Sequence, residues 1–279
     1  MIDGDTRILG VIGDPIGQSL SPAIQNAALK HYGMNYLYLA FPVSTDQVKG
    51  VIQSVRLFQM PGLNVTAPHK ERVLPLMNEL SETARRLGAV NTVVRREGKL
   101  IGENTDYDGF AHALQRMRNR KRMRTAILFG AGGASRAVLA VLLDQKFDEV
   151  ILACRKPARG RKTIAQLKAA SAVRVVPWDQ RERVQADLLV NATPLGQRAR
   201  DPLPATARVT RHAKGVMDLV ARPGGTRWTA LARSYGIPAQ EGSEMLIAQG
   251  RESFRLWFGK TPPFGVMQEA LAAAAGRCA

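Results

Sequence analysis

The sequence is poor in cysteine and in long apolar runs. Its 279 residues include only two cysteines, Cys154 and Cys278, which are too few for a disulfide framework or a cysteine-ligated zinc site. Its four histidines occur at no spacing typical of metal ligands. No apolar stretch approaches the ~20 residues that span a bilayer, and the first residues lack the pattern of a signal peptide. These absences predict a reduced, metal-free, cytoplasmic protein.

Acidic residues are also scarce relative to basic ones. Forty lysines and arginines face 23 aspartates and glutamates, which gives a net charge of +17 and implies attraction to anions. The densest basic run, Arg116 to Arg124, carries no interleaved aromatic residue, so we interpret it as a solvated helix end and linker. A basic nucleic-acid-binding protein is the non-enzymatic alternative, and it predicts tight, salt-sensitive binding to duplex DNA.

Strand and helix signals alternate along the chain, which is typical of an α/β protein with right-handed crossovers. Apolar runs predict strands at 7–12, 36–41, 63–65, 125–129, 149–153, 173–176, 187–191 and 215–219, with a hairpin over 91–102. Helical spacing predicts helices at 21–31, 45–58, 71–77, 81–87, 107–117, 134–143, 162–169, 242–258 and 268–274. The basic linker after 117 separates two such series, so we expect two domains.

The segment Gly62-Leu-Asn-Val-Thr-Ala-Pro-His-Lys70 predicts a short buried strand that breaks at Pro68. The strand end is a rigid platform that aims Lys70 at a fixed place. Asp106, in Asn104-Thr105-Asp106, would supply a carboxylate from a second such platform. An ammonium and a carboxylate placed in this way can transfer a proton to or from a hydroxyl or a carbonyl group.

The segment from Ala126 to Val138 contains a strand, a glycine-rich turn and a helix in direct succession. Gly130 permits a tight turn, and Gly132 lets backbone N–H groups approach a pyrophosphate at the positive end of the helix. Ser135 stands where the usual fingerprint has a third glycine. The strand before, the helix after and the second strand beyond nevertheless favour a dinucleotide-binding turn over a structural glycine loop.

The end of that second strand favours NADP over NAD. NAD-binding folds present an acidic residue there for the ribose 2′-hydroxyl, but this chain has Ala153-Cys154-Arg155-Lys156, with Arg159 beyond. A guanidinium suits a 2′-phosphate in both charge and geometry. The alternative is a basic loop that serves only solubility.

Together these segments resemble the shikimate dehydrogenase family over nearly the whole chain. The motifs that carry the resemblance are Pro15-Ile-Gly-Gln-Ser-Leu-Ser-Pro22, the 62–70 segment, Gly88-Ala-Val-Asn-Thr92, Gly102-Glu-Asn-Thr-Asp106, Gly130-Ala-Gly-Gly-Ala134, Asn191-Ala-Thr-Pro-Leu-Gly196, and Met245-Leu-Ile-Ala-Gln249 with Trp257-Phe-Gly. The resemblance implies an N-terminal αβ substrate domain at 1–106, joined by residues 243–279, and a Rossmann-like NADP-binding domain at 107–242. The C-terminal helix would fold back on the first domain, with the active site in a cleft between the two.

The family's reaction is the reversible, NADP-dependent reduction of 3-dehydroshikimate to shikimate, in aromatic amino acid biosynthesis. The resemblance implies that Lys70 and Asp106 are catalytic. It implies that the substrate is bound by Ser19, Ser21, Thr66, Asn91, Asp106 and Gln249. It implies that NADP is bound by Gly130, Ala131, Gly132, Gly133, Ala134, Arg155, Lys156, Arg159, Thr193, Leu219 and Gly242, with no metal. Without a ligand, Ser21 could simply cap the first helix, and Asn91 and Asp106 could be turn residues.

Two positions depart from the family pattern. Gln18 stands where histidine is usual, and Ala221 stands where tyrosine is usual. The departures leave quinate/shikimate or aminoshikimate dehydrogenase activity open as alternatives, while Thr66 and the missing acidic residue lean toward shikimate with NADP. An inactive NADP-binding sensor is a further alternative, and retention of Lys70 and Asp106 argues against it. We expect a small-molecule substrate, no specific nucleic acid or membrane partner, and a monomer or homodimer.

Overall fold

A computed structural model describes residues 2–118, 122–169, 171–198, 200–222 and 224–275. The chain divides into two compact units. Unit 1 comprises Met1–Asp108 and Ile247–Ala279, and unit 2 comprises Gly109–Leu246. Cys278 and the middle of the basic run between 116 and 124 lie outside the described residues.

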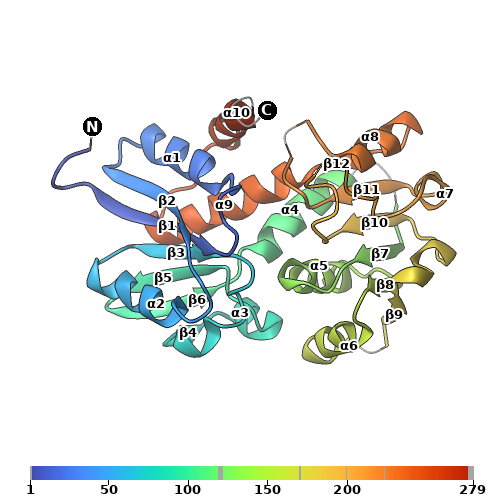
Figure 1. Ribbon diagram of the computed structural model, residues 1–279, viewed down its shortest axis with the longest axis horizontal. Helices are drawn as coiled ribbons and strands as arrows, with labels where there is room; N and C mark the ends of the chain where they lie inside the picture. The colour runs from blue at the N-terminus through green and yellow to red at the C-terminus, as the bar shows by residue number, and fades with distance from the viewer. Residues whose placement is uncertain (1, 119–121, 170, 199, 223, 276–279) are drawn as a thin grey trace. The chain divides into compact units, whose positions relative to one another are not determined.

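Unit 1 is built on a mixed six-stranded sheet in the order β2-β1-β3-β5-β6-β4 (Figure 1). β1 pairs in parallel with both β2 and β3, whereas β5 runs antiparallel to β3 and β6. The antiparallel pair β5–β6 is the expected hairpin, which turns at Glu97 and Gly98, both with positive φ. The strands are β1 (Arg7–Gly13), β2 (Tyr36–Pro42), β3 (Gly62–Val65), β4 (Glu79–Leu80), β5 (Thr92–Arg96) and β6 (Lys99–Glu103).

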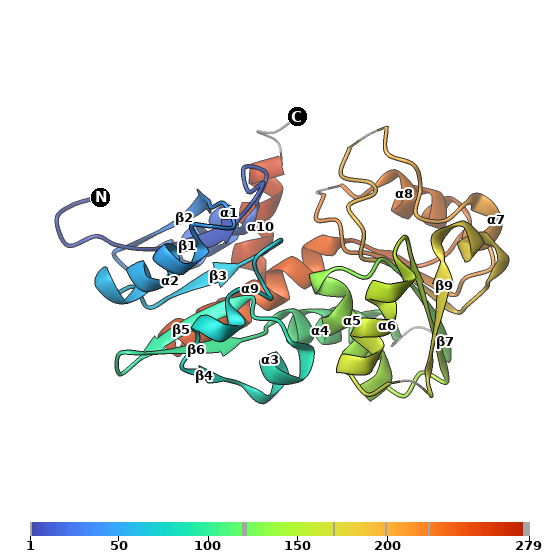
Figure 2. The ribbon, with the colours of Figure 1, turned by 60° about the horizontal axis from the view of Figure 1, so that its bottom comes forward.

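Helices cover both faces of the unit 1 sheet. Figure 2 shows α2 (Val48–Leu57) and α3 (Glu82–Leu87) on one face and α9 (Gly242–Phe258) on the other. Ile52 and Val55 of α2 are buried in a cluster with Leu63 of β3. On the opposite face, the indole N–H of Trp257 in α9 donates to the carbonyl of Val93 at 3.0 Å. α1 (Ser21–His31) lies beside α10 (Phe264–Ala275). The C-terminal helices therefore complete the unit formed by the N-terminal part of the chain.

Unit 2 is built on an all-parallel six-stranded sheet in the order β12-β11-β10-β7-β8-β9. The order reverses beside β7, which pairs with both β8 and β10. Open sheets of this kind bind ligands beyond the carboxyl ends of the strands at such a reversal. The strands are β7 (Thr125–Phe129), β8 (Glu149–Cys154), β9 (Val173–Pro177), β10 (Leu188–Asn191), β11 (Gly215–Asp218) and β12 (Ala239–Gln240).

The helices of unit 2 also lie on both faces of its sheet. α7 (Ala207–Thr210) and α8 (Arg227–Ser234) contribute Val209 and Trp228 to a buried cluster with Phe129. α5 (Gly133–Asp144) and α6 (Pro157–Gln166) lie on the other face (Figure 2). α4 (Asp106–Arg118) enters unit 2 from unit 1. No helix among the described residues is long and apolar enough to cross a membrane, and none of their side chains form a cluster able to hold a metal ion.

Three helix predictions need correction, and one of them is the helix expected at 268–274, which is α10 and begins at Phe264. Residues 71–77 form a turn followed by a short 3₁₀ segment, Leu74–Leu76, rather than an α-helix. Pro75 lies inside that segment and cannot donate a helical hydrogen bond. The helix expected at 162–169 is α6, which begins at Pro157 and ends at Gln166. Proline favours the first helical turn, so Pro157 was the signal for the earlier start.

Candidate functional site

The backbone around Lys70 is held by hydrogen bonds to several neighbouring segments. β3 ends at Val65, and the N–H of Thr66 donates to Ile12 of β1 at 2.9 Å. The buried His69 ring donates from Nε2 to the carbonyl of Val43, at 2.7 Å. The Lys70 carbonyl accepts from the N–H of Val90 at 2.8 Å. These bonds fix the segment that carries the amine, although Lys70 lies beyond the end of β3.

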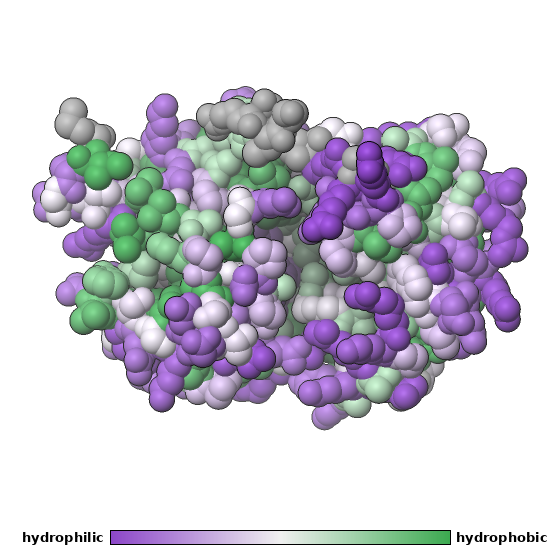
Figure 3. Space-filling model, in the orientation of Figure 1, coloured by the Kyte–Doolittle hydropathy of each residue, from purple (hydrophilic) through white to green (hydrophobic). Residues whose placement is uncertain are grey.

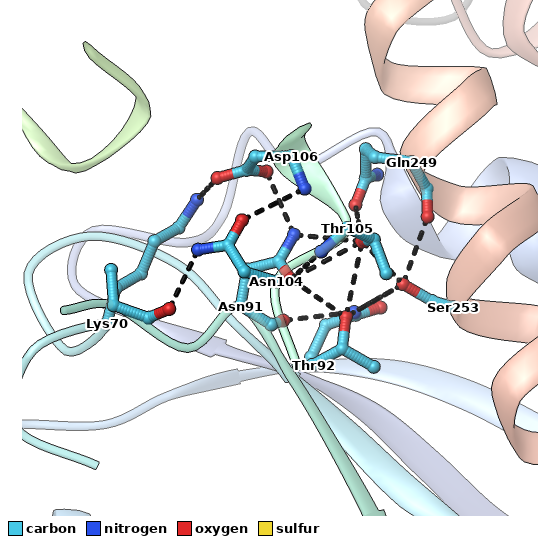
Figure 4. A network of polar contacts seen from close by, with 10 residues as sticks. Lys70, Asn91, Thr92, Asn104, Thr105, Asp106, Gln249 and Ser253 are labelled. Atoms are coloured by element: carbon cyan, nitrogen blue, oxygen red, sulfur yellow. Dashed lines mark hydrogen bonds and ion pairs between the residues drawn. The ribbon is translucent and has the colours of Figure 1, made fainter. Parts of the chain in front are cut away.

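Lys70 and Asp106 form an ion pair. Nζ of Lys70 lies 2.5 Å from Oδ2 of Asp106, and the side chains are 13% and 8% exposed (Figure 4). The other carboxylate oxygen, Oδ1, accepts from Nδ2 of Asn91 at 2.9 Å. Asn104 accepts from the Asp106 N–H and donates to the carbonyl of Ala89. The carboxylate is therefore held by Lys70 and Asn91 and its backbone by Asn104, and the Lys70 side chain keeps a small exposed surface.

Asn91 links this pair to a buried group of hydroxyls. Its Oδ1 accepts from the N–H of Thr105 at 2.8 Å and from the hydroxyl of Thr92 at 3.0 Å. Asn91 and both threonines are at most 3% exposed. An amide side chain bonded at both its oxygen and its nitrogen has a single orientation, so Asn91 is a rigid part of the site rather than a free turn residue.

Helix α9 adds two polar side chains to the same group (Figure 4). The Ser253 hydroxyl is fully buried and lies within hydrogen-bonding distance of Asn64, Thr92 and Thr105, at 3.1, 2.9 and 3.1 Å. Gln249 lies one turn earlier, with Oε1 3.5 Å from the Thr105 hydroxyl. Gln249 was expected to contact the substrate, whereas Ser253 was not predicted as a site residue. Ser253 lies four residues after Gln249 on the same face of the helix, and this spacing was the signal that could have predicted it.

The two serines before and at the start of α1 lie near a second branch of the network. The Ser21 hydroxyl interacts with Tyr38, whose pKa is raised well above its usual value by burial. Tyr38 in turn donates to Oδ1 of Asn64 at 2.8 Å. The expectation that Ser21 could cap α1 is wrong: Leu20 is the N-cap residue, and Ser21 is already inside the helix. The Ser19 hydroxyl accepts from the Ser21 N–H at 3.3 Å.

The glycine turn of unit 2 has the geometry of an anion cradle. Gly130 has φ +102° and follows β7, and α5 begins at Gly133. The Ser135 hydroxyl accepts from the N–H of Gly132 at 3.0 Å, which closes the turn in place of a third glycine. A Cβ at Gly132 would meet no heavy atom of the described residues within 4 Å. Open space above a helix N-terminus is where a phosphate gains from the helix dipole.

Basic side chains follow β8, the neighbouring strand. Arg155 and Lys156 are exposed directly after Cys154, and Arg159 is exposed in the first turns of α6. The Cys154 side chain is buried, and burial raises the pKa of its thiol. The end of this strand thus presents cations and no carboxylate, which suits the additional phosphate of NADP.

The other residues expected to bind the cofactor lie close to the glycine turn or to one another. A Cβ at Gly130 would lie 2.9 Å from Cγ2 of Thr193, so the loop after β10 lies against the turn. A Cβ at Gly242 would lie 2.4 Å from the carbonyl oxygen of Leu219, so only glycine fits beside the loop after β11. Unit 2 therefore assembles the predicted dinucleotide residues around the carboxyl ends of β7, β8, β10 and β11.

A separate apolar groove lies in unit 1. It is lined by residues of β2, α2 and their connection, including Phe41, Val51 and Phe58, and neither Lys70 nor Asp106 lines it. Leu57 and Phe58 are exposed at the end of α2, and Figure 3 shows green patches over this part of the unit. The groove is therefore distinct from the polar site around Lys70.

Comparisons with known families match two segments of the chain. Residues 11–93 match the shikimate dehydrogenase substrate binding domain, and residues 242–272 match the shikimate 5'-dehydrogenase C-terminal domain. Both segments contribute side chains to the polar site, since the first contains Lys70 and Asn91 and the second contains Gln249 and Ser253.

Comparisons with whole proteins extend the match along the chain. The NADP(+) shikimate dehydrogenase of Rubrobacter xylanophilus is 41% identical over 275 residues, which cover 97% of each chain. The crystal structure of shikimate 5-dehydrogenase from Thermus thermophilus, in complex with NADP(H) and shikimate, is 35% identical with a TM-score of 0.83 and covers 96% of this chain and 99% of its own. The quinate dehydrogenase of Corynebacterium glutamicum, in complex with NAD, is 30% identical with a TM-score of 0.88, over 96% and 99%.

Proposed function

This chain belongs to the shikimate dehydrogenase family, and on that premise we propose that it catalyses the reversible, NADP-dependent reduction of 3-dehydroshikimate to shikimate. The observation that carries the proposal is the ion pair between Lys70 and Asp106, held by Asn91 within a buried polar network. Such a pair suits proton transfer at a carbonyl or hydroxyl group. The product is an intermediate of aromatic amino acid biosynthesis.

Unit 1 is the proposed substrate-binding part and unit 2 the proposed NADP-binding part. In unit 1, Ser19 and Ser21 offer hydroxyls near the start of α1 for the substrate carboxylate, and Thr66, Asn91 and Gln249 offer polar groups for the ring hydroxyls. A small polyhydroxylated acid needs such a set of donors and acceptors, because each of its polar groups leaves water on binding.

The residues of unit 2 fit NADP. The open space above Gly132, at the N-terminus of α5, suits the pyrophosphate. Arg155, Lys156 and Arg159 suit the 2′-phosphate by charge, and Arg155 can bind it through two N–H groups. NADPH, when bound, supplies the hydride that reduces the substrate carbonyl.

Lys70 donates the proton in one direction of the reaction and accepts it in the other. As the carbonyl carbon is reduced, negative charge grows on its oxygen, and the Lys70 ammonium stabilises that charge and gives the oxygen a proton. In the direction of shikimate oxidation, the neutral amine takes the hydroxyl proton back. Asp106 orients the amine through the ion pair, and its Oδ1 is oriented by Asn91. Asp106 also offers a carboxylate to the neighbouring substrate hydroxyl.

The test is an assay of dinucleotide reduction with shikimate plus NADP, repeated with NAD and with quinate. We expect the highest kcat/KM with shikimate and NADP. A clear preference for quinate would instead support the second candidate, a quinate/shikimate dehydrogenase, which is favoured by the likeness to the Corynebacterium enzyme and by Gln18 and Ala221. No turnover with either acid would refute the proposal. We expect the enzyme to act in the cytoplasm as a monomer or a homodimer.

A further inference from the structure

Asp218 is a buried carboxylate that the proposed chemistry does not use. It is the last residue of β11 and is 1% exposed. Three donors from different segments converge on it. Oδ1 accepts from Nδ2 of Asn191 at 2.8 Å and from the N–H of Val220 at 3.1 Å, and Oδ2 accepts from the hydroxyl of Thr226 at 2.6 Å. Burial raises the pKa of the Asp218 carboxyl, whereas the hydrogen bonds from Thr226, Val220 and Asn191 favour its ionised form and satisfy its oxygens.

Asn191 connects Asp218 to the loop after β10 through hydrogen bonds. Its Nδ2 donates to Asp218 and also to the carbonyl of Leu195, at 2.9 Å. Its Oδ1 accepts from the N–H and the hydroxyl of Thr193, at 3.0 and 2.6 Å. The Thr193 hydroxyl then accepts from the Leu195 N–H at 3.2 Å. The loop 192–196 is therefore folded around one amide side chain, and Asp218 holds that amide in place.

The loop after β11 is fixed in the same way. The bond from Val220 to Asp218 turns the chain directly after the strand, and the Leu219 N–H donates to the Asn191 carbonyl at 2.9 Å. Thr226 also accepts from the N–H of Thr229, so the residue that donates to Asp218 caps α8. One carboxylate thus connects the ends of β10 and β11 and the start of α8.

Both loops border the predicted dinucleotide site. Thr193 lies against Gly130, and Leu219 lies against Gly242, as the close approaches of a Cβ at each glycine demonstrate. Ligands of open parallel sheets bind beyond the carboxyl ends of the strands, which is where these loops lie. With an exposure of 1%, Asp218 sits behind that surface and is not a contact residue.

We propose that Asp218 is a positioning residue for dinucleotide binding, which acts through Asn191 and Val220 to fix the loops 192–196 and 219–220 beside the glycine turn. The inference rests on the proposed NADP-dependent function. It predicts that losing the carboxylate weakens NADP binding even though the side chain does not touch the cofactor.

Asp187 provides a matched control at the opposite ends of the strands in the same sheet. Its carboxylate also accepts several bonds, from the N–H of Arg124 at 2.7 Å and from Nζ of Lys214 at 2.8 Å. It directly precedes β10, so it holds the amino ends of the strands rather than the carboxyl ends. Replacing either aspartate by asparagine keeps the size and shape of the side chain and exchanges one acceptor oxygen for an NH₂ donor. Only Asp218→Asn is expected to change NADP binding.

The experiment measures the Kd of NADP by calorimetry for wild type, Asp218→Asn and Asp187→Asn, together with thermal unfolding of each. Asp218→Asn should raise Kd at least about tenfold, which corresponds to about 1.4 kcal/mol. Asp187→Asn should lower the unfolding temperature and leave Kd unchanged. Amide hydrogen exchange without ligand gives a second readout: Asp218→Asn should speed exchange at Thr193 and Leu195, whose N–H groups bond within the loop.

The outcomes separate the inference from the function on which it rests. A wild-type Kd in Asp218→Asn would overturn the inference alone, as would an equal loss of NADP affinity in Asp187→Asn, because that result would reflect general destabilisation. Failure of the wild-type protein to bind NADP would overturn the proposed function and the inference together. If Asp218→Asn does not fold, Thr226→Val removes one of the three donors, and an unchanged Kd in that variant would count against the inference.

Discussion

Replacing Lys70 by methionine tests the proposed chemistry most directly. The change removes the amine and keeps most of the aliphatic stem, so the main loss is the charge that lies 2.5 Å from Asp106. Proton transfer by a positioned side chain contributes about 10²–10⁴ in rate. The same amine would also stabilise the charge that grows on the carbonyl oxygen. We therefore expect kcat to fall by about a thousandfold or more, which raises the barrier by about 4 kcal/mol.

Lys99 offers a control of similar geometry in the same unit. Its Nζ lies 2.7 Å from Glu79, but the two side chains are 61% and 52% exposed, against 13% and 8% for Lys70 and Asp106. Exposed pairs contribute about 0–1 kcal/mol to stability, so Lys99→Met should alter neither kcat nor the unfolding temperature appreciably. The comparison distinguishes a specific role of Lys70 from the general effect of replacing a paired lysine by methionine.

The assay follows formation of reduced nicotinamide from shikimate and NADP at saturating concentrations, and calorimetry measures shikimate binding to each variant. Loss of kcat with shikimate binding retained would place Lys70 in the chemical step. Near-normal turnover in Lys70→Met would refute the reasoning, and so would an equal loss in Lys99→Met.

Three further predictions concern the cofactor, the polar network and pH. Arg155→Ala should raise KM for NADP by about tenfold and leave KM for NAD nearly unchanged, because the guanidinium is assigned to the 2′-phosphate; equal effects on both dinucleotides in steady-state kinetics would contradict that assignment. Ser253→Ala should lower the free energy of unfolding in urea by about 1–3 kcal/mol, because its buried partners lose a hydrogen bond. Ser234→Ala, on the surface, should lower it far less. Asp108 is exposed in the first turn of α4. The pKa of its carboxyl is raised to about 6 from 3.8, first by desolvation and then by the charge of Glu252, so folding favours its protonated form by a small free energy that solvent screening reduces. Asp108→Asn should therefore be more stable than wild type above about pH 6, and thermal unfolding should show the gain shrinking as pH falls toward 3.8; a constant gain would contradict this.

Local pattern predicted much of the fold and part of the candidate site. Apolar runs predicted most of the strands but not the two-residue strands β4 and β12. β3 was predictable because its buried run ends just before Pro68, and Lys70 follows that proline. The glycine turn was readable because its residues are constrained by backbone geometry. These features depend on neighbours within a few positions, where sequence and structure are directly connected.

Features that depend on distant partners were not readable. Ser253 is a small residue inside an apolar helix face, and only the fold brings it to Asn64 and Thr92. Asp218 is recognisable as a strand end, but its donors come from positions 191, 220 and 226. The absence of the helix expected at 71–77 has a local cause instead, because Pro75 cannot donate a helical hydrogen bond.

The interrupted course of unit 1 has a consequence for biogenesis. Asn64 and Thr92 leave the ribosome early, but the hydroxyl that completes their hydrogen bonding belongs to residue 253, beyond the whole of unit 2. Because emerging domains generally fold as units, unit 2 has its entire sequence available first, while the N-terminal part of unit 1 still lacks the Ser253 hydroxyl. The lysine-bearing lobe should therefore mature last during translation, and a pause late in synthesis would expose that lobe, rather than the nucleotide lobe, to chaperones.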